Sequence, residues 1–244
     1  MKFFTESEIE LELTQKFVLE NLSDLKHLNL GYSHVDFGDA YKISFNQLKC
    51  ATETTKNIES LAFNFSSYDL NEIKRLFEMF PNIKRLIFEP EDNADNNDVQ
   101  LLFHISETNI KLETLNISHL DIEDLRTIYF PNLKEFSVKH WNEAVLCPFI
   151  NRHSKTLEKI SIYSAEDINP LVAKEILNCD NMKCVELSTS GTNLSFLGAF
   201  LETALNVKRL TLRITYDEIE RKMFVFPDDK VFWDEEITFL GTKV

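Results

Sequence analysis

Two histidines near the middle of the chain, His119 and His140, are the residues whose type and spacing come closest to metal chemistry. They stand at the same place in two consecutive copies of an internal repeat, so their side chains should be neighbours. Adjacent imidazoles are common zinc ligands, but a zinc site needs three or four protein ligands. The repeat places no third ligand beside them, and the nearest cysteine, Cys147, falls in the helical part of the repeat. We therefore predict no metal site and no cofactor.

The same part of the chain carries a mixed group of aromatic and basic residues. Lys139 and Trp141 flank His140, and Tyr163 stands at the position of Lys139 in the next repeat. These residue types together are typical of protein-binding surfaces. A second interpretation of Trp141 stays open, because its position in the repeat is normally buried and suits a core residue equally well. The predicted protein-binding residues are His119, Lys139, His140, Trp141, Tyr163, Arg209 and Arg213.

Calcium-binding and enzyme motifs are incomplete or missing. The acidic stretch 89–98 resembles a calcium loop, but an alignment that starts at Asn93 puts Asp98 and His104 where an EF-hand needs Gly and Glu. The chain contains no glycine-rich phosphate loop, no Gly-x-Ser-x-Gly elbow and no His-Glu-x-x-His motif. Its four cysteines lack the close pairing of a metal site. We predict that the protein is not an enzyme and has no catalytic residues.

The candidate residues are positioned by a repeated pattern of the form apolar-x-x-apolar-x-apolar. The pattern occurs eight times, at intervals of 21 to 33 residues, and all 24 of its defining positions are apolar in a chain whose apolar share is 43%. Positions four and six alternate with polar residues, as expected for a strand with one buried face. The copies begin at Leu25, Ile58, Ile83, Leu112, Leu133, Leu157, Met182 and Val207.

Between these strand cores the apolar spacing changes to that of a helix. The clearest predicted helices are 69–80, 98–108 and 193–204, and weaker ones are 14–22, 45–55, 122–130, 142–153 and 167–178. An asparagine stands directly before position one in five copies. Asparagine tolerates the left-handed conformation that ends many helices, so it should turn the chain into the next strand. These residues are Asn57, Asn82, Asn132, Asn181 and Asn206.

Strand–helix repeats of roughly 25 residues stack only with their strands parallel. Strands pair about 4.8 Å apart, whereas helices need roughly 8–10 Å between axes, so the stack must bend with its strands inside. We predict an α/β solenoid of horseshoe shape, with a parallel concave sheet and convex helices. Residues 1–24 should form an N-terminal cap, residues 25–215 about eight repeats, and residues 216–244 a C-terminal cap that covers the last apolar face.

Over residues 25–212 the chain resembles the leucine-rich repeat proteins, whose strand motif is LxxLxL. The phrases FPNIKRL at 80–86 and FPNLKEF at 130–136 are similar to the irregular repeats of F-box substrate receptors. The family's Asn or Cys at position nine is absent, and an F-box itself is not found. The resemblance implies a module whose concave face captures a protein, as in the substrate-recognition part of a ubiquitin ligase receptor. The alternative is a scaffold or adaptor with no link to ubiquitylation.

Position two of successive copies alternates in charge, and we call this set the charge row. Neighbouring opposite charges on adjacent strands contribute roughly 0.2–1 kcal/mol per pair, so the row should fix the order of the repeats; a charged recognition surface is the other interpretation. The alternation fails at the last step, and with Arg209 and Arg213 this end is basic and favours an acidic partner. The charge row comprises Lys26, Glu59, Lys84, Glu113, Lys134, Glu158, Lys183 and Lys208.

Net charge and targeting signals narrow the partners and the compartment. A formal charge of −14 argues against binding to nucleic acid and to anionic membranes, which both require clustered cations. The first residues become acidic before an apolar run develops, which is unlike a secretory signal, and no run of about 18 apolar residues exists. We expect an intracellular protein, cytoplasmic or nuclear, that is monomeric alone and whose partner is another protein.

Overall fold

The computed structural model describes residues 26–29, 57–64, 70–89, 96–120, 126–163, 170–190, 207–215 and 235–240. The chain divides into two compact units. The first comprises Met1–Ile117 with Phe130–Asn132, and the second comprises Ser118–Tyr129 with Leu133–Val244. Both alternate strands with helices, so the predicted α/β class is confirmed.

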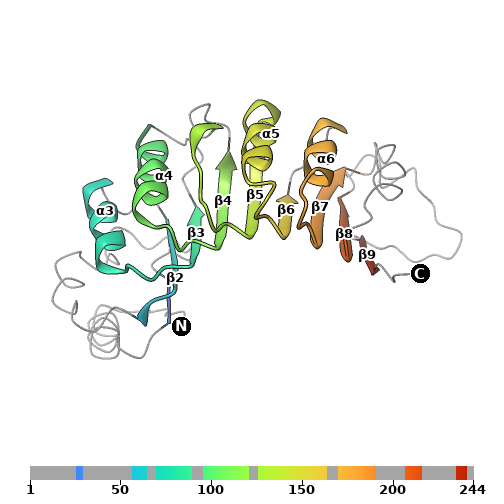
Figure 1. Cartoon of the computed structure of the whole chain (residues 1–244). Helices are drawn as coiled ribbons and strands as arrows, with labels where there is room; N and C mark the ends of the chain where they lie inside the picture. Colours follow the sequence, from blue (N-terminus) through green and yellow to red (C-terminus); the bar gives the residue numbers. More distant parts are fainter. Residues whose placement is uncertain are drawn as a thin grey trace, which may run out of the picture. The chain divides into compact units, whose positions relative to one another are not determined.

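The first unit consists of parallel strands joined by helices that lie on one side of them (Figure 1). The strands pair in register, so that position four of each repeat forms one continuous buried row: Leu28, Leu61, Leu86 and Leu115. The elements are β1 (His27–Asn29), β2 (Ser60–Asn64), α3 (Leu70–Met79), β3 (Arg85–Glu89), α4 (Asn96–Thr108) and β4 (Thr114–Leu120), whose first four residues belong to this unit.

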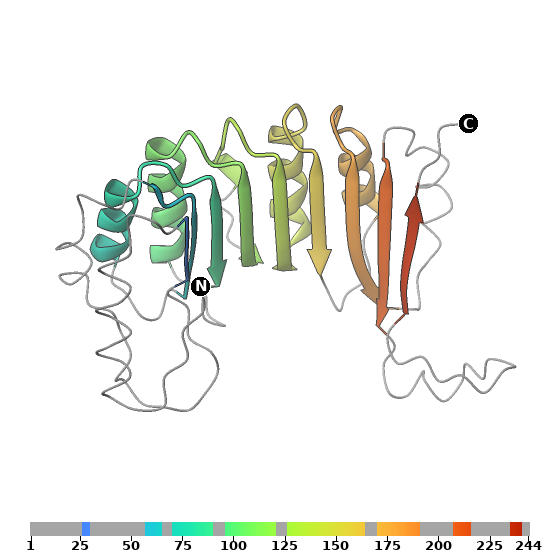
Figure 2. The same ribbon diagram turned by 90° about the horizontal axis from the view of Figure 1, so that it is seen from below.

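The second unit repeats this plan and adds one strand of opposite direction. Strands β5 to β8 are parallel, and Figure 2 shows β9 running antiparallel to β8. Position four again forms a buried row: Phe136, Ile160, Val185 and Leu210. The elements are β5 (Glu135–Trp141), α5 (Glu143–Arg152), β6 (Lys159–Tyr163), α6 (Pro170–Leu177), β7 (Cys184–Ser190), β8 (Arg209–Thr215) and β9 (Glu235–Leu240).

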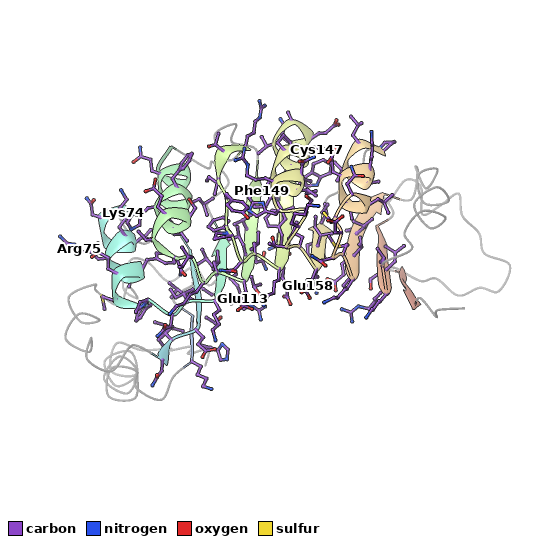
Figure 3. The ribbon with its side chains drawn as sticks, viewed as in Figure 1. Lys74, Arg75, Glu113, Cys147, Phe149 and Glu158 are labelled. Atoms are coloured by element: carbon purple, nitrogen blue, oxygen red, sulfur yellow. The ribbon has the colours of Figure 1, made fainter. Side chains whose placement is uncertain are left out.

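Amphipathic helices close the core on one face of the strands. In α3 the apolar stripe that includes Ile73 and Leu76 is buried, while Arg75 is exposed. In α5 the ring of Phe149 packs on that of Phe136, with 4.6 Å between their centroids. Figure 3 shows Phe149 between α5 and the strands. Helix α5 begins where the Asn142 side chain accepts a hydrogen bond from the backbone N–H of Ala144 at 2.8 Å, which is an ordinary N-cap.

The junction asparagines make a contact that the sequence did not predict. Asn132 donates from Nδ2 to the backbone carbonyl of Ile110 at 2.6 Å, and Asn181 donates in the same way to Lys155 at 2.6 Å. In both cases the acceptor lies at the preceding junction, one repeat earlier. The asparagines therefore tie consecutive junctions together, in addition to any part they play in turning the chain.

Strands and helices agree with the predicted positions in the described residues, with one exception at 126–130. A strand forms at each of the eight repeat cores, and α3, α4, α5 and α6 fall on four of the predicted helices. Within the predicted helix 122–130, the described residues 126–130 form no α-helix. The predicted helices 14–22, 45–55 and 193–204 and the N-terminal cap 1–24 lie outside the described residues. Of the predicted C-terminal cap, 216–244, only β9 is described.

Candidate functional site

The second unit presents one face of its strands without a covering helix among the described residues, and we call it the open face. Side chains alternate between the two faces of a strand. Helices α5 and α6 lie on one side of the strands (Figure 2). Phe136 and Val138 are buried towards that side, so the residues that alternate with them point to the open side. The open face carries Glu135, Ser137, Lys139, Lys159, Ser161, Tyr163, Cys184, Glu186, Ser188, Arg209 and Thr211.

The carboxylate of Glu186 on β7 is the centre of a polar network on this face. Its Oε1 lies 2.8 Å from Nζ of Lys159, and its Oε2 accepts hydrogen bonds from the hydroxyl groups of Ser161 at 2.8 Å and Tyr163 at 3.2 Å. All three partners come from β6, at every second residue of one strand. Because β6 and β7 pair in register, a single carboxylate meets three donors from its neighbouring strand.

Arg209 approaches the same carboxylate from β8, on the other side of β7. Its Nη2 atom lies 3.6 Å from Oε1 of Glu186, and its Nε donates to the Sγ of Cys184 at 3.2 Å. Cys184 and Arg209 are direct partners in the β7–β8 register. Two cations, Lys159 and Arg209, therefore share the one carboxylate.

The electrostatics of this network favour the charged forms of Glu186 and Lys159. Burial alone would raise the pKa of the Glu186 carboxyl, but hydrogen bonds from Lys159, Ser161 and Tyr163 and the charge of Lys159 outweigh burial and hold the pKa below its usual value. Burial would likewise lower the pKa of Lys159, yet its contact with Glu186 raises the pKa overall. The pair is consequently ionised at neutral pH.

Two of the predicted binding residues, Tyr163 and Arg209, meet in this network through their common contact with Glu186. Arg213 lies on β8, four residues further along the strand, where its backbone pairs with Ser188 on one side and Glu236 on the other. The side chain of Arg213 is outside the described atoms.

The other predicted residues lie at the ends of β4 and β5. Lys139 and His140 are exposed, and Lys139 follows the last residue pair of the β5–β6 register, Val138 with Ile162, which puts it beside Tyr163. His119 is on β4, and its side chain is not described.

The structure of Trp141 fits neither a fully buried core residue nor a fully exposed binding residue. Its side chain is partly buried, and its indole Nε1 is buried with no hydrogen-bond partner among the described residues. A buried indole N–H ordinarily finds an acceptor, so the ring is packed without the polar contact expected of a settled core tryptophan.

Sequence reasoning did not single out Glu186, Lys159, Ser161 or Cys184. The signal was present in the repeat, because aligning positions three and five of successive copies places Lys159, Cys184 and Arg209 in one row and Ser161 beside Glu186 in the next.

The charge row is present within each unit. Backbone hydrogen bonds of 2.8 Å link Lys84 to Glu59 and Lys183 to Glu158, and their side chains form ion pairs of 3.3 and 2.7 Å. Figure 3 shows Glu158 at the edge where the strands of its unit begin. These pairs are solvent-exposed, so their contribution to stability is small, roughly 0.2–1 kcal/mol each.

The helical side of the second unit has a shallow groove between α5 and α6. Its lining includes Cys147 and Arg152, and the side chain of Asn151 donates to Glu175 across it at 3.1 Å. Burial and the nearby carboxylates of Glu143 and Glu175 raise the pKa of the Cys147 thiol to about 11, so it remains protonated and unreactive at neutral pH.

Across the described segments, no group of three or more His, Cys, Asp or Glu side chains is arranged to hold a metal ion. No helix in those segments is both long enough and apolar enough to cross a membrane. The open face offers charged and hydroxyl groups on a rigid sheet, an arrangement suited to recognition by hydrogen bonds and ion pairs.

No protein-family model matches the chain, and the search of curated proteins finds no match either.

Proposed function

We propose that the chain is a protein-binding module of the leucine-rich repeat kind, in which the open face forms part of a concave surface that captures a segment of another protein. The observation that carries this proposal is the difference between the two faces of strands β5 to β8. One face is buried under α5 and α6, and the other presents polar side chains from every strand.

The leucine-rich repeat assignment has support in both units. Strand and helix alternate, the strands are parallel, and position four of each repeat pairs with position four of the next. Strands spaced closer than the helices that cover them produce curvature, which is the reason for proposing a horseshoe.

The finer proposal is that the module serves as the substrate-recognition part of an F-box-type receptor of a ubiquitin ligase. Its support is the FPN phrase at two junctions. Phe80 and Phe130 are buried, and the asparagine that follows each, Asn82 and Asn132, bonds to the adjoining junction. The phrase thus has a structural use in stacking irregular repeats. A scaffold without ubiquitylation uses the same architecture, and the experiment below separates the two.

The test is affinity capture from cell lysate with three forms of the full chain, read by mass spectrometry. The variant Lys139→Glu with Tyr163→Ala changes the open face. The control Lys174→Glu makes the same charge change at an exposed site on α6, on the helical side. We expect the open-face variant to lose a partner by about tenfold or more, as at an interface hot spot, while the control keeps it.

The outcomes are distinct. If the partner is lost equally from both variants, or is retained by both, recognition by the open face is contradicted. Recovery of a cullin-type ligase complex with the wild-type chain supports the receptor function, whereas a partner that is lost in the open-face variant without any ligase component supports a scaffold. Thermal midpoints of all three forms show whether a loss reflects unfolding, because an unfolded variant loses every partner.

A further inference from the structure

We infer that the partner's docking element is an acidic segment, and that its carboxylates bind where β7 and β8 begin. This inference rests on the proposed function, since it names the chemistry of the protein that the open face recognises. The residues that carry it are Lys183, Lys208 and Arg209, which we call the basic end.

The charge row ends in two adjacent lysines. The backbone N–H of Lys208 donates to the carbonyl of Lys183 at 2.8 Å, so the two residues are neighbours across the strands, and both are exposed. Lys183 is paired with Glu158 at 2.7 Å on its other side. Lys208 forms no ion pair with any described residue. Like charges on adjacent strands repel, and a carboxylate from a partner would relieve that repulsion.

Arg209 follows directly and is held in position for binding. Its Nε is fixed by the Sγ of Cys184, while within the described part of the chain its terminal guanidinium nitrogens donate no hydrogen bond. About half of its side chain, 49%, is exposed. The guanidinium group is already oriented, and its one terminal ion contact in the described residues, 3.6 Å from Nη2 to Glu186, is longer than a hydrogen bond. It can therefore donate to the two oxygens of a partner's carboxylate, and little conformational entropy is lost on binding.

The acidic side chains that the structure describes near the basic end, Glu158 and Glu186, are already engaged in ion pairs. Glu186 contacts both Lys159 and Arg209, so one negative charge is shared by two cations. In the backbone register of β8 with β9, Glu236 stands opposite Arg213 at the far end of β8, whereas Arg209 stands opposite the apolar Leu240. Among the described residues, a positive surplus therefore remains at the start of β8.

This surplus stands out because the whole chain carries a net charge of −14. A basic segment would be attracted to most of the protein and repelled at the basic end, whereas an acidic segment would find its favourable site there. Three clustered cations on so acidic a protein are too few to hold the phosphate backbone of a nucleic acid at physiological salt.

The test uses the full chain and a dye-labelled twelve-residue peptide of alternating Glu and Gly, with the Gln/Gly peptide of the same length as its neutral match. Binding is measured by fluorescence anisotropy at low and at physiological salt. We expect the acidic peptide alone to bind, with affinity that falls as salt increases. Arg209→Gln should weaken it by about tenfold and Lys208→Gln by about threefold, since a bidentate contact is stronger than a point charge.

Matched variants separate local recognition from general charge. Arg75→Gln removes an exposed arginine from α3 in the first unit and should leave affinity unchanged. Arg209→Lys keeps the positive charge but lacks the planar guanidinium group with its two parallel donors, so it should reduce the affinity by an intermediate amount. If the neutral peptide binds as well as the acidic one, or if Arg75→Gln and Arg209→Gln have equal effects, the inference is wrong.

The inference and the proposed function fail by different results. A captured partner that depends on the open face, but whose cross-linked segment is neutral or basic, overturns the inference and leaves the proposed function standing. Acidic-peptide binding that requires Arg209, together with a lysate capture that is insensitive to Lys139→Glu with Tyr163→Ala, supports the inference about this surface and contradicts the wider open-face proposal.

Discussion

Lys159 on β6 and Glu186 on β7 form an ion pair across adjacent parallel strands, with 2.8 Å between Nζ and Oε1. Their side chains are 31% and 20% exposed, so the pair is neither a free surface contact nor a fully buried one. In this intermediate setting the hydrogen bonds from Ser161 and Tyr163 matter, because they satisfy the second oxygen of a carboxylate that has lost much of its water.

Replacing Glu186 by glutamine should lower the free energy of unfolding by about 1–2 kcal/mol. Hydrogen bonds to a charged group contribute roughly 1.5–3 kcal/mol, and partial solvation reduces that figure here. The substitution leaves Lys159 and Arg209 close together without their shared counter-charge. Urea denaturation at neutral pH measures the change. Glu158→Gln, at the more exposed pair with Lys183, is the control and should cost less, roughly 0.2–1 kcal/mol. Equal costs would mean that the Glu186 network adds nothing beyond a surface pair.

A second prediction concerns His153, which is fully buried at the end of α5. Its ring stacks on Tyr129 with 5.2 Å between centroids and packs at a tilt against Phe149 with 4.3 Å. Its Nδ1 lies 2.8 Å from the carbonyl oxygen of Phe149, which only accepts, so Nδ1 carries the proton of the neutral ring. Burial lowers the pKa of His153 to about 4, and the nearby charge of Arg152 acts in the same direction. The hydrogen bond to Phe149 raises the pKa but does not offset them.

The sign of the pH effect follows from that shift. The unfolded chain binds a proton at His153 below about pH 6.5, while the folded chain resists it until about pH 4, so the contribution to stability is complete above pH 6.5 and is lost as the pH falls towards 4. The loss amounts to about 3 kcal/mol. The difference in unfolding free energy between the wild type and His153→Gln should shrink by that amount over this range.

The control for a lost histidine is His140→Gln, which removes an exposed ring on β5. Both variants lose one imidazole ring, but only His153→Gln removes a buried one. If His153→Gln fails to fold, the ring resonances of His153 in the wild type provide the measurement by NMR. A ring that titrates near pH 6.5 would contradict the prediction.

The sequence predicted the framework better than the site, for a physical reason. The buried row from Phe136 to Leu210 leaves an apolar signature in every repeat, because each member must be apolar irrespective of its neighbours. The four described helices follow from the same rule, since an amphipathic stripe is visible in a single stretch of sequence. A requirement that each residue must meet by itself, such as being apolar at a buried position, can therefore be predicted from the sequence.

The network around Glu186 depends instead on relations between repeats. The sequence around Glu186 does not indicate that its carboxylate contacts three donors on β6. The register of β6 with β7 brings Lys159, Ser161 and Tyr163 to it. The junction asparagines are a similar case. Their fixed offset predicted a turn, whereas the hydrogen bond of Asn181 to Lys155 is a contact between repeats that spacing alone does not specify.

That contact gives the third prediction. Asn181→Ala should lower the free energy of unfolding by about 0.5–1 kcal/mol, because it removes a 2.6 Å hydrogen bond that is partly replaced by water at an exposed junction. Asn178→Ala is the matched control in the same turn region, where the exposed amide side chain makes no hydrogen bond to a described residue. We expect the control to stay within about 0.5 kcal/mol of the wild type. Urea denaturation compares the two, and an equal effect would show that the junction bond contributes nothing.

The fourth prediction tests the aromatic core that supports the open face from behind. Phe149 is 1% exposed and contacts both Phe136 and His153, so Phe149→Ala opens a cavity beneath β5. Such truncations cost about 3–5 kcal/mol, and thermal or urea unfolding should show a loss of that size. Phe149→Leu keeps most of the volume, should cost about 1–2 kcal/mol, and serves if the alanine variant does not fold. Leu171 on α6 is 53% exposed, so Leu171→Ala should change stability by less than about 0.5 kcal/mol. A small loss for Phe149→Ala would mean that α5 does not hold the strands in place, and that the geometry of the open face has another support.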